Sequence, residues 1–79
     1  MPIDPSNWHY VWYRIDEERR KRKWTWAELC KRAHIRMSSW MVGVRAFHPT
    51  EDEMHKIADA MGLTYDFIRN GYPGWEPAR

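Results

Sequence analysis

Two short helices joined by a very short connection are predicted between residues 25 and 45, and this stretch constrains the fold more than any other. Thr25, with Glu28 three residues later, has the capping-box spacing that opens a helix. The apolar residues of this first helix recur on one face: Trp26, Leu29, Cys30 and Ala33. A second helix is expected over about 36–45, starting between Arg36 and Ser38. Helices so closely joined must cross steeply, as in a helix-turn-helix.

One further helix is predicted before this unit, over residues 8–22. Ser6 or Asn7 supplies its N-cap, and apolar residues recur at helical spacing from Trp8 onward. The first half of this helix is aromatic and its second half is highly charged. We therefore expect only the first half and Ile15 to dock strongly on a core.

Two more helices are predicted after the unit. Thr50 and Glu53 repeat the capping-box spacing, and Gly62 suits a left-handed C-cap. Thr64 then caps a short last helix that stops near residues 70 and 71, before an irregular tail over 72–79. The predicted fold class is all-α, a compact five-helix bundle in a single domain over 1–79.

Composition limits the chemistry available to so small a chain. A 79-residue domain has a marginal core, and its six Trp, four Tyr and two Phe supply the apolar area that it needs. A single cysteine excludes an internal disulfide, and no cysteine or histidine spacing resembles a zinc site, so no metal or cofactor is expected. No apolar run approaches the ~18 residues of a membrane span, and the N-terminus lacks a signal-peptide pattern, so a soluble, cytoplasmic protein without membrane contact is expected.

Charge is distributed unevenly along the chain, although the formal net charge is only +2. Basic residues outnumber acidic ones over 14–36, whereas acidic residues dominate over 49–68. One end of the molecule should therefore be basic and the other acidic, and a basic flank beside a helix-turn-helix suggests a polyanionic partner. The alternative is that the run from Arg19 to Lys23 is a solvated helix end whose cations suit the helix dipole.

The residues resemble a known family, the phage-repressor and Cro type of helix-turn-helix, also called the XRE family. The segment PTEDEMHKIADAMGLTYDFI, over 49–68, is similar to the fourth and fifth helices of that family. Further upstream, Thr25, Glu28 and Leu29 fall on its helix-two pattern, and Cys30 falls on the small Ala of that pattern. The resemblance covers residues 14–71 and implies a lambda-repressor-like DNA-binding domain.

Several residues depart from the family pattern. His34 replaces the usual Gly of the turn, Arg36 the capping Ser, and Trp26 the Gln that often touches DNA. Val44 replaces the Glu that pairs with the arginine at the end of helix one, which here is Arg19. Arg19 is therefore expected to turn to solvent, to an acidic side chain or to phosphate.

The resemblance implies a sequence-specific regulator of transcription that binds double-stranded DNA with the helix at about 36–45 in the major groove. Candidate base contacts are Arg36, Met37, Ser38, Ser39, Met41 and Val42. Candidate phosphate contacts are Arg22, Lys23, Thr25, Trp26, Arg45 and His48. Repressors of this type commonly bind two-fold related half-sites as homodimers in a prokaryotic or phage-infected cell, and the candidate dimer residues are Trp8, Tyr72 and Trp75.

Two features of the sequence are relevant to functions other than DNA binding. Exposed methionine is common at protein-binding surfaces, so Met37 or Met41 could mark a helix-turn-helix fold turned to a protein partner. For an enzyme, Cys30 and His34 lie four residues apart and could form a thiolate pair. No third orienting group or phosphate-binding glycine loop accompanies them, so neither an enzyme nor a small-molecule substrate is expected.

Overall fold

The computed structural model describes residues 4–36 and 48–76 of the chain. Over these ranges the structure is all-helical, without a strand, and contains four helices: α1 (Trp8–Lys21), α2 (Trp26–Arg32), α4 (Glu51–Met61) and α5 (Tyr65–Asn70). All four agree with the predicted ranges within about one residue at each end. The helix expected over about 36–45 falls, apart from Arg36, outside the described residues, so the fifth helix and the helix-turn-helix stay predictions. No helix in the described ranges has the length and apolar character of a membrane span.

Side-chain caps fix where these helices begin. Asn7 caps α1 by accepting a hydrogen bond from the backbone N–H of His9. Thr50 opens α4 with the complete, reciprocal capping box that its spacing with Glu53 predicts. The side chains of Thr25 and Thr64 accept from the backbone three residues on, at the starts of α2 and α5 respectively. These ends are determined locally, which is why the sequence predicts them well.

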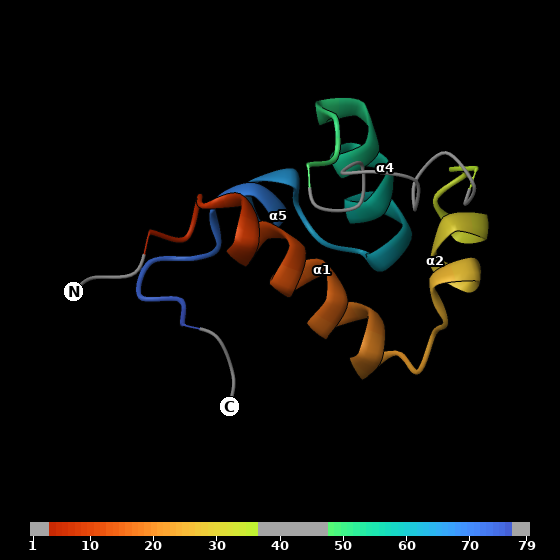
Figure 1. The fold of residues 1–79 in the computed structure, drawn as a ribbon, viewed down its shortest axis with the longest axis horizontal. Helices are drawn as coiled ribbons and strands as arrows, with labels where there is room; N and C mark the ends of the chain where they lie inside the picture. The colour runs from red at the N-terminus through yellow and green to blue at the C-terminus, as the bar shows by residue number, and fades with distance from the viewer. Residues whose placement is uncertain (1–3, 37–47, 77–79) are drawn as a thin grey trace.

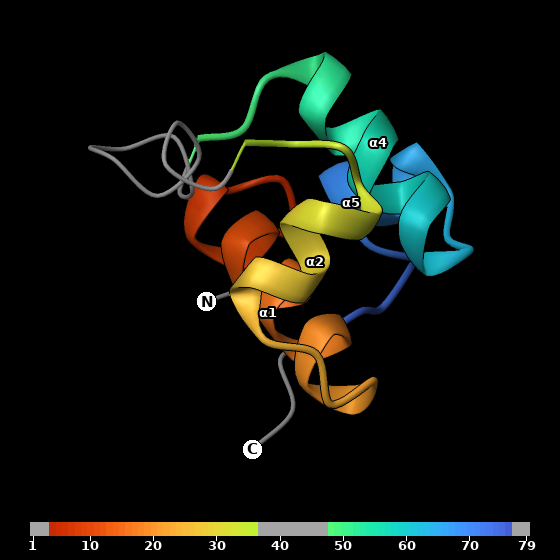
Figure 2. The ribbon, with the colours of Figure 1, turned by 90° about the vertical axis from the view of Figure 1, so that its right-hand side faces the viewer.

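The helices enclose one hydrophobic core. Figure 1 shows α1 crossing the molecule with α5 behind it, and Figure 2 looks onto α2, which lies beyond the C-terminal end of α1. Along the chain of contacts, α1 packs on α5, α5 on α4, and α4 on α2. The buried cluster between them comprises Val11, Ile15, Leu29, Cys30, Ala33, Met54, Ile57, Ala58, Met61 and Ile68.

The charged half of α1 is more deeply buried than the sequence predicts. Arg14, Asp16 and Glu18 are all buried, so the expectation that only the aromatic half and Ile15 dock on the core is wrong. The reason is that each carboxylate has cationic partners one helical turn away, while Arg14 lies under the C-terminal tail. Ion pairing lowers the cost of removing these groups from water.

The tail returns to the body of the molecule through Trp75. This indole is buried, and its ring meets Tyr10 and Tyr13 edge-on, with centroids 5.8 and 6.2 Å away. The guanidinium of Arg14 lies over the same ring, 4.6 Å from its centroid. Trp75 therefore anchors the tail against the first half of α1 as a core residue.

Candidate nucleic-acid interface

Arg19 organises the connection between α1 and α2. Its guanidinium pairs with Asp16 at 2.7 Å, donates to the carbonyl oxygen of Trp24 at 2.6 Å, and lies 4.6 Å from the centroid of the Trp26 ring. Of the three outcomes expected for this arginine, the acidic side chain is the one observed. Lys23 turns the chain between the helices with a φ of 60°, a left-handed conformation uncommon outside glycine. The connection is thus held in one geometry beside an exposed lysine.

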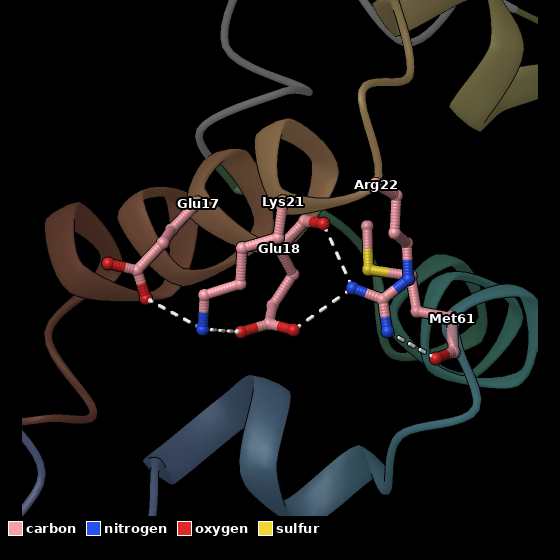
Figure 3. Close-up of polar contacts among 5 residues, drawn as sticks. All are labelled: Glu17, Glu18, Lys21, Arg22 and Met61. Atoms are coloured by element: carbon pink, nitrogen blue, oxygen red, sulfur yellow. Dashed lines mark hydrogen bonds and ion pairs between the residues drawn. The ribbon is translucent and has the colours of Figure 1, made fainter.

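Arg22, a predicted phosphate contact, is held by hydrogen bonds inside the protein. It donates to the carbonyl oxygen and to the carboxylate of Glu18, at 2.9 and 3.0 Å, and to the carbonyl oxygen of Met61 at 2.6 Å (Figure 3). Burial alone would raise the pKa of Glu18, but hydrogen bonds from Lys21 and Arg22 outweigh it and hold that pKa below its usual value. Binding phosphate through Arg22 would require breaking this link between α1 and α4.

Two other predicted phosphate contacts lie at the start of α2. The exposed Thr25 uses its hydroxyl to accept from the backbone N–H of Glu28 at 3.1 Å. Trp26 is half-buried, stacked on Trp12 with ring centroids 6.1 Å apart, and covered by Arg19. Its ring therefore packs α2 against α1.

Sequence reasoning missed a cluster around Trp24. Arg22 and Arg32 both lie near this indole, with guanidinium carbons 5.7 and 4.7 Å from a ring centroid. Arg32 also pairs with Glu28 through Nε at 2.7 Å. Part of the signal was present in the sequence, because Glu28 and Arg32 lie four residues apart on α2 and such residues are neighbours on a helix. Trp24 precedes the N-cap Thr25, so helical spacing does not predict its place in the cluster.

On the α1–α2 side of the molecule, cationic side chains are more exposed than their carboxylate partners, so the surface is more positive than the count of charged residues indicates. The side chain of Arg20 is 59% exposed whereas that of its partner Asp16 is 12% exposed. On α4 the order is reversed, since Asp52 is 77% exposed and its partner Lys56 43%. The carboxylate of Asp16 thus turns inward near the end of α1, whereas that of Asp52 projects outward from α4. The exposed cations of residues 20–36 are Arg20, Lys21, Lys23, Lys31, Arg32 and Arg36.

The structure separates His48 from the other described phosphate candidates. Its exposed imidazole lies against Trp8, with ring centroids 5.0 Å apart, and Arg69 lies over the same indole at 4.5 Å. Trp8 begins α1, whereas Lys23 follows the end of that helix, 14 residues long. At a rise of ~1.5 Å per residue these groups stand about 20 Å apart. His48 therefore lies apart from the basic surface that contains Lys23.

The predicted dimer residues differ in how exposed they are, and of the predicted base contacts the structure describes Arg36. Among the dimer candidates, Trp8 is half-buried, Trp75 is buried, and Tyr72 is exposed and stacked on Phe67 with ring centroids 5.9 Å apart. Tyr72 is thus the dimer candidate most accessible to a second subunit. Arg36 is exposed directly after α2. Outside the described residues lie Met37, Ser38, Ser39, Met41, Val42 and Arg45.

Cys30 and His34, the pair considered for catalysis, have different environments. His34 is exposed with a φ of 58° in the turn after α2, while Cys30 is buried in the core. Burial, and to a lesser degree the charge of Glu53, raises the pKa of the Cys30 thiol and disfavours the thiolate.

The described surface has no pocket and no group of three potential metal ligands. The candidate interface is therefore an open, basic surface.

Comparison with known proteins gives no further assignment. No protein-family model, curated protein or solved structure matches the chain. The resemblance to the Cro and repressor family consequently stays a prediction that rests on the quoted residues. What the structure contributes is an all-helical fold with a basic surface where α1 meets α2.

Proposed function

We propose that the protein is a sequence-specific, double-stranded DNA-binding regulator of transcription of the phage Cro or repressor type. The observation that carries the proposal is the exposed basic surface at the α1–α2 side, where cations project outward and their carboxylate partners turn inward. DNA is a dense polyanion, and cations placed in this way release its counterions on binding. The acidic outer face of α4 would point away from the DNA.

Sequence reading is assigned to the segment that follows α2. Arg36 is exposed at its start, where its guanidinium could bind the O6 and N7 atoms of a guanine. The serines and methionines that follow would reach base edges and thymine methyl groups, with the helix at about 36–45 in the major groove. Lys23 and Thr25 would hold phosphates on the flank. Two copies would occupy two-fold related half-sites.

Selection from a random pool of duplex DNA tests this proposal. Wild-type protein should enrich a defined sequence, and Arg36→Ala combined with Ser38→Ala should abolish the preference because both side chains are assigned to bases. Lys23→Ala should weaken binding to all sequences alike, because its contact is to phosphate. An unenriched pool from protein with a normal helical circular dichroism spectrum would contradict sequence-specific binding.

The alternative function is recognition of a protein partner by the same segment. It predicts that Met37→Asp or Met41→Asp abolishes capture of the partner and leaves the helical fold intact. The DNA proposal predicts instead that this segment selects a defined duplex sequence from the random pool. A folded protein that enriches no duplex and loses a partner on Met37→Asp would favour the alternative.

A further inference from the structure

Arg32 ends α2 in the sequence, but its charge lies toward the beginning of that helix. Side chains on a helix lean toward its N-terminus. The guanidinium of Arg32 follows this direction, pairing with Glu28 through Nε at 2.7 Å and lying 4.7 Å from a ring centroid of Trp24. It is thereby brought toward the start of α2, where the exposed Lys23 and Thr25 lie.

The contacts of Arg32 leave its outer nitrogens available. A guanidinium has five N–H donors, and within the described residues the hydrogen bond of Arg32 uses Nε alone. Arg22, on the same indole, differs because both of its terminal nitrogens donate to protein oxygens. Within the described ranges, the terminal nitrogens of Arg32 thus have no protein acceptor, and its side chain is 52% exposed.

We propose that Arg32, held against Trp24 and anchored by Glu28, is a phosphate-binding residue of the DNA interface. This inference rests on the proposed function and replaces Arg22 by Arg32 among the phosphate contacts. The two terminal nitrogens match two oxygens of one phosphate, a geometry that an ammonium cannot reproduce. Stacking on the indole and the Glu28 ion pair restrict the side chain before DNA arrives, so less rotamer entropy is lost on binding.

The test is the salt dependence of binding to a random-sequence DNA duplex. For wild type and Arg32→Ala, the logarithm of the association constant is plotted against that of the salt concentration. Loss of one phosphate contact reduces the magnitude of the slope by about 1. Arg32→Lys should restore the slope in part, because it keeps the charge but not the fork. Thermal unfolding establishes that each variant is folded.

Lys56→Ala is the matched control, since it removes one exposed cation from the acidic face of α4. The slope for Lys56→Ala should equal that of wild type if the change seen for Arg32→Ala comes from a lost phosphate contact and not from the lower net charge. An Arg32→Ala slope equal to wild type would overturn this inference and leave DNA binding standing. Equal slope losses for Arg32→Ala and Lys56→Ala would overturn it as well. Failure of the wild type to bind either random or selected duplexes would overturn the proposed function with it.

Discussion

Arg14 is a cation of α1 whose burial makes the charged form costly to keep. Its guanidinium is fully buried, and burial together with the charge of Arg69 lowers its pKa to about 10. It donates twice to the carbonyl oxygen of Ile68, at 3.2 and 2.9 Å, and stacks on Trp75, while Nη1 has no hydrogen-bond partner among the described residues. These contacts tie α1 to α5 and to the tail.

Replacing Arg14 with Ala should lower the free energy of unfolding by about 2 kcal/mol or more, because it leaves a cavity and an unpaired carbonyl oxygen. Arg14→Met should cost less, since it fills most of the volume and removes the buried charge. Arg20→Ala is the control, because Arg20 is exposed and should change stability by less than about 0.5 kcal/mol. Urea unfolding followed by circular dichroism measures all three. An Arg14→Ala protein as stable as Arg20→Ala would contradict the structural role.

Cys30 should make stability depend on pH in the alkaline range. Burial raises the pKa of its thiol above the ordinary value of 9.0. The unfolded chain therefore loses this proton first, so the stability contributed by Cys30 is complete below the ordinary pKa and is lost as pH rises through the raised one. Urea unfolding at about pH 7 and pH 10 should show a larger loss of stability for wild type than for Cys30→Ala. Equal losses would show that the thiol is not responsible.

At the scale of elements, two glycines end helices with similar φ angles in different surroundings. Gly62 ends α4 with a φ of 69°, and a Cβ added there meets nothing within 4 Å. Gly71 follows α5 with a φ of 73° and a ψ of −169°, a combination essentially restricted to glycine. A Cβ on Gly71 would approach Trp75 Cβ to 3.1 Å. The tail therefore depends on Gly71 for close packing as well as for its turn.

Gly62→Ala should destabilise the protein by about 1 kcal/mol, the strain of a left-handed residue with a Cβ. Gly71→Ala should cost more, because the same methyl group also displaces Trp75. The comparison is made by thermal unfolding, with intrinsic tryptophan fluorescence reporting on the tail. Equal effects of the two substitutions would contradict the packing of the tail against Gly71.

The sequence predicts the ends of these elements better than the contacts between them. Thr50 with Glu53, and Gly62, act on backbone groups a few residues away, so their spacing is sufficient to place α4. The contact between Arg22 and the carbonyl of Met61 spans 39 residues, and no local pattern encodes it. Burial of Arg14 is likewise set by the returning tail. Long-range packing decides which arginines of α1 remain accessible to a partner.

In the molecule as a whole, the formal net charge is only +2, but the fold exposes cations at one end and carboxylates at the other. The sequence predicts a basic stretch followed by an acidic one. The structure adds that Asp16 and Glu18 turn inward near the α1–α2 connection, whereas Asp52 turns outward on α4. The proposed base contacts fall within residues 36–45, of which Arg36 belongs to the described ranges. The exposed cations of the proposed polyanion-binding surface all lie within the described residues.

The most direct test of the central claim, that this surface binds a polyanion, is the affinity of the wild-type protein for duplex DNA as salt rises from about 50 to about 200 mM, measured by fluorescence anisotropy. The proposed phosphate contacts of Lys23 and Arg32 predict that affinity falls at least about tenfold over this range. Folded protein that binds no DNA at the lowest salt, or binds with an affinity indifferent to salt, would contradict the account.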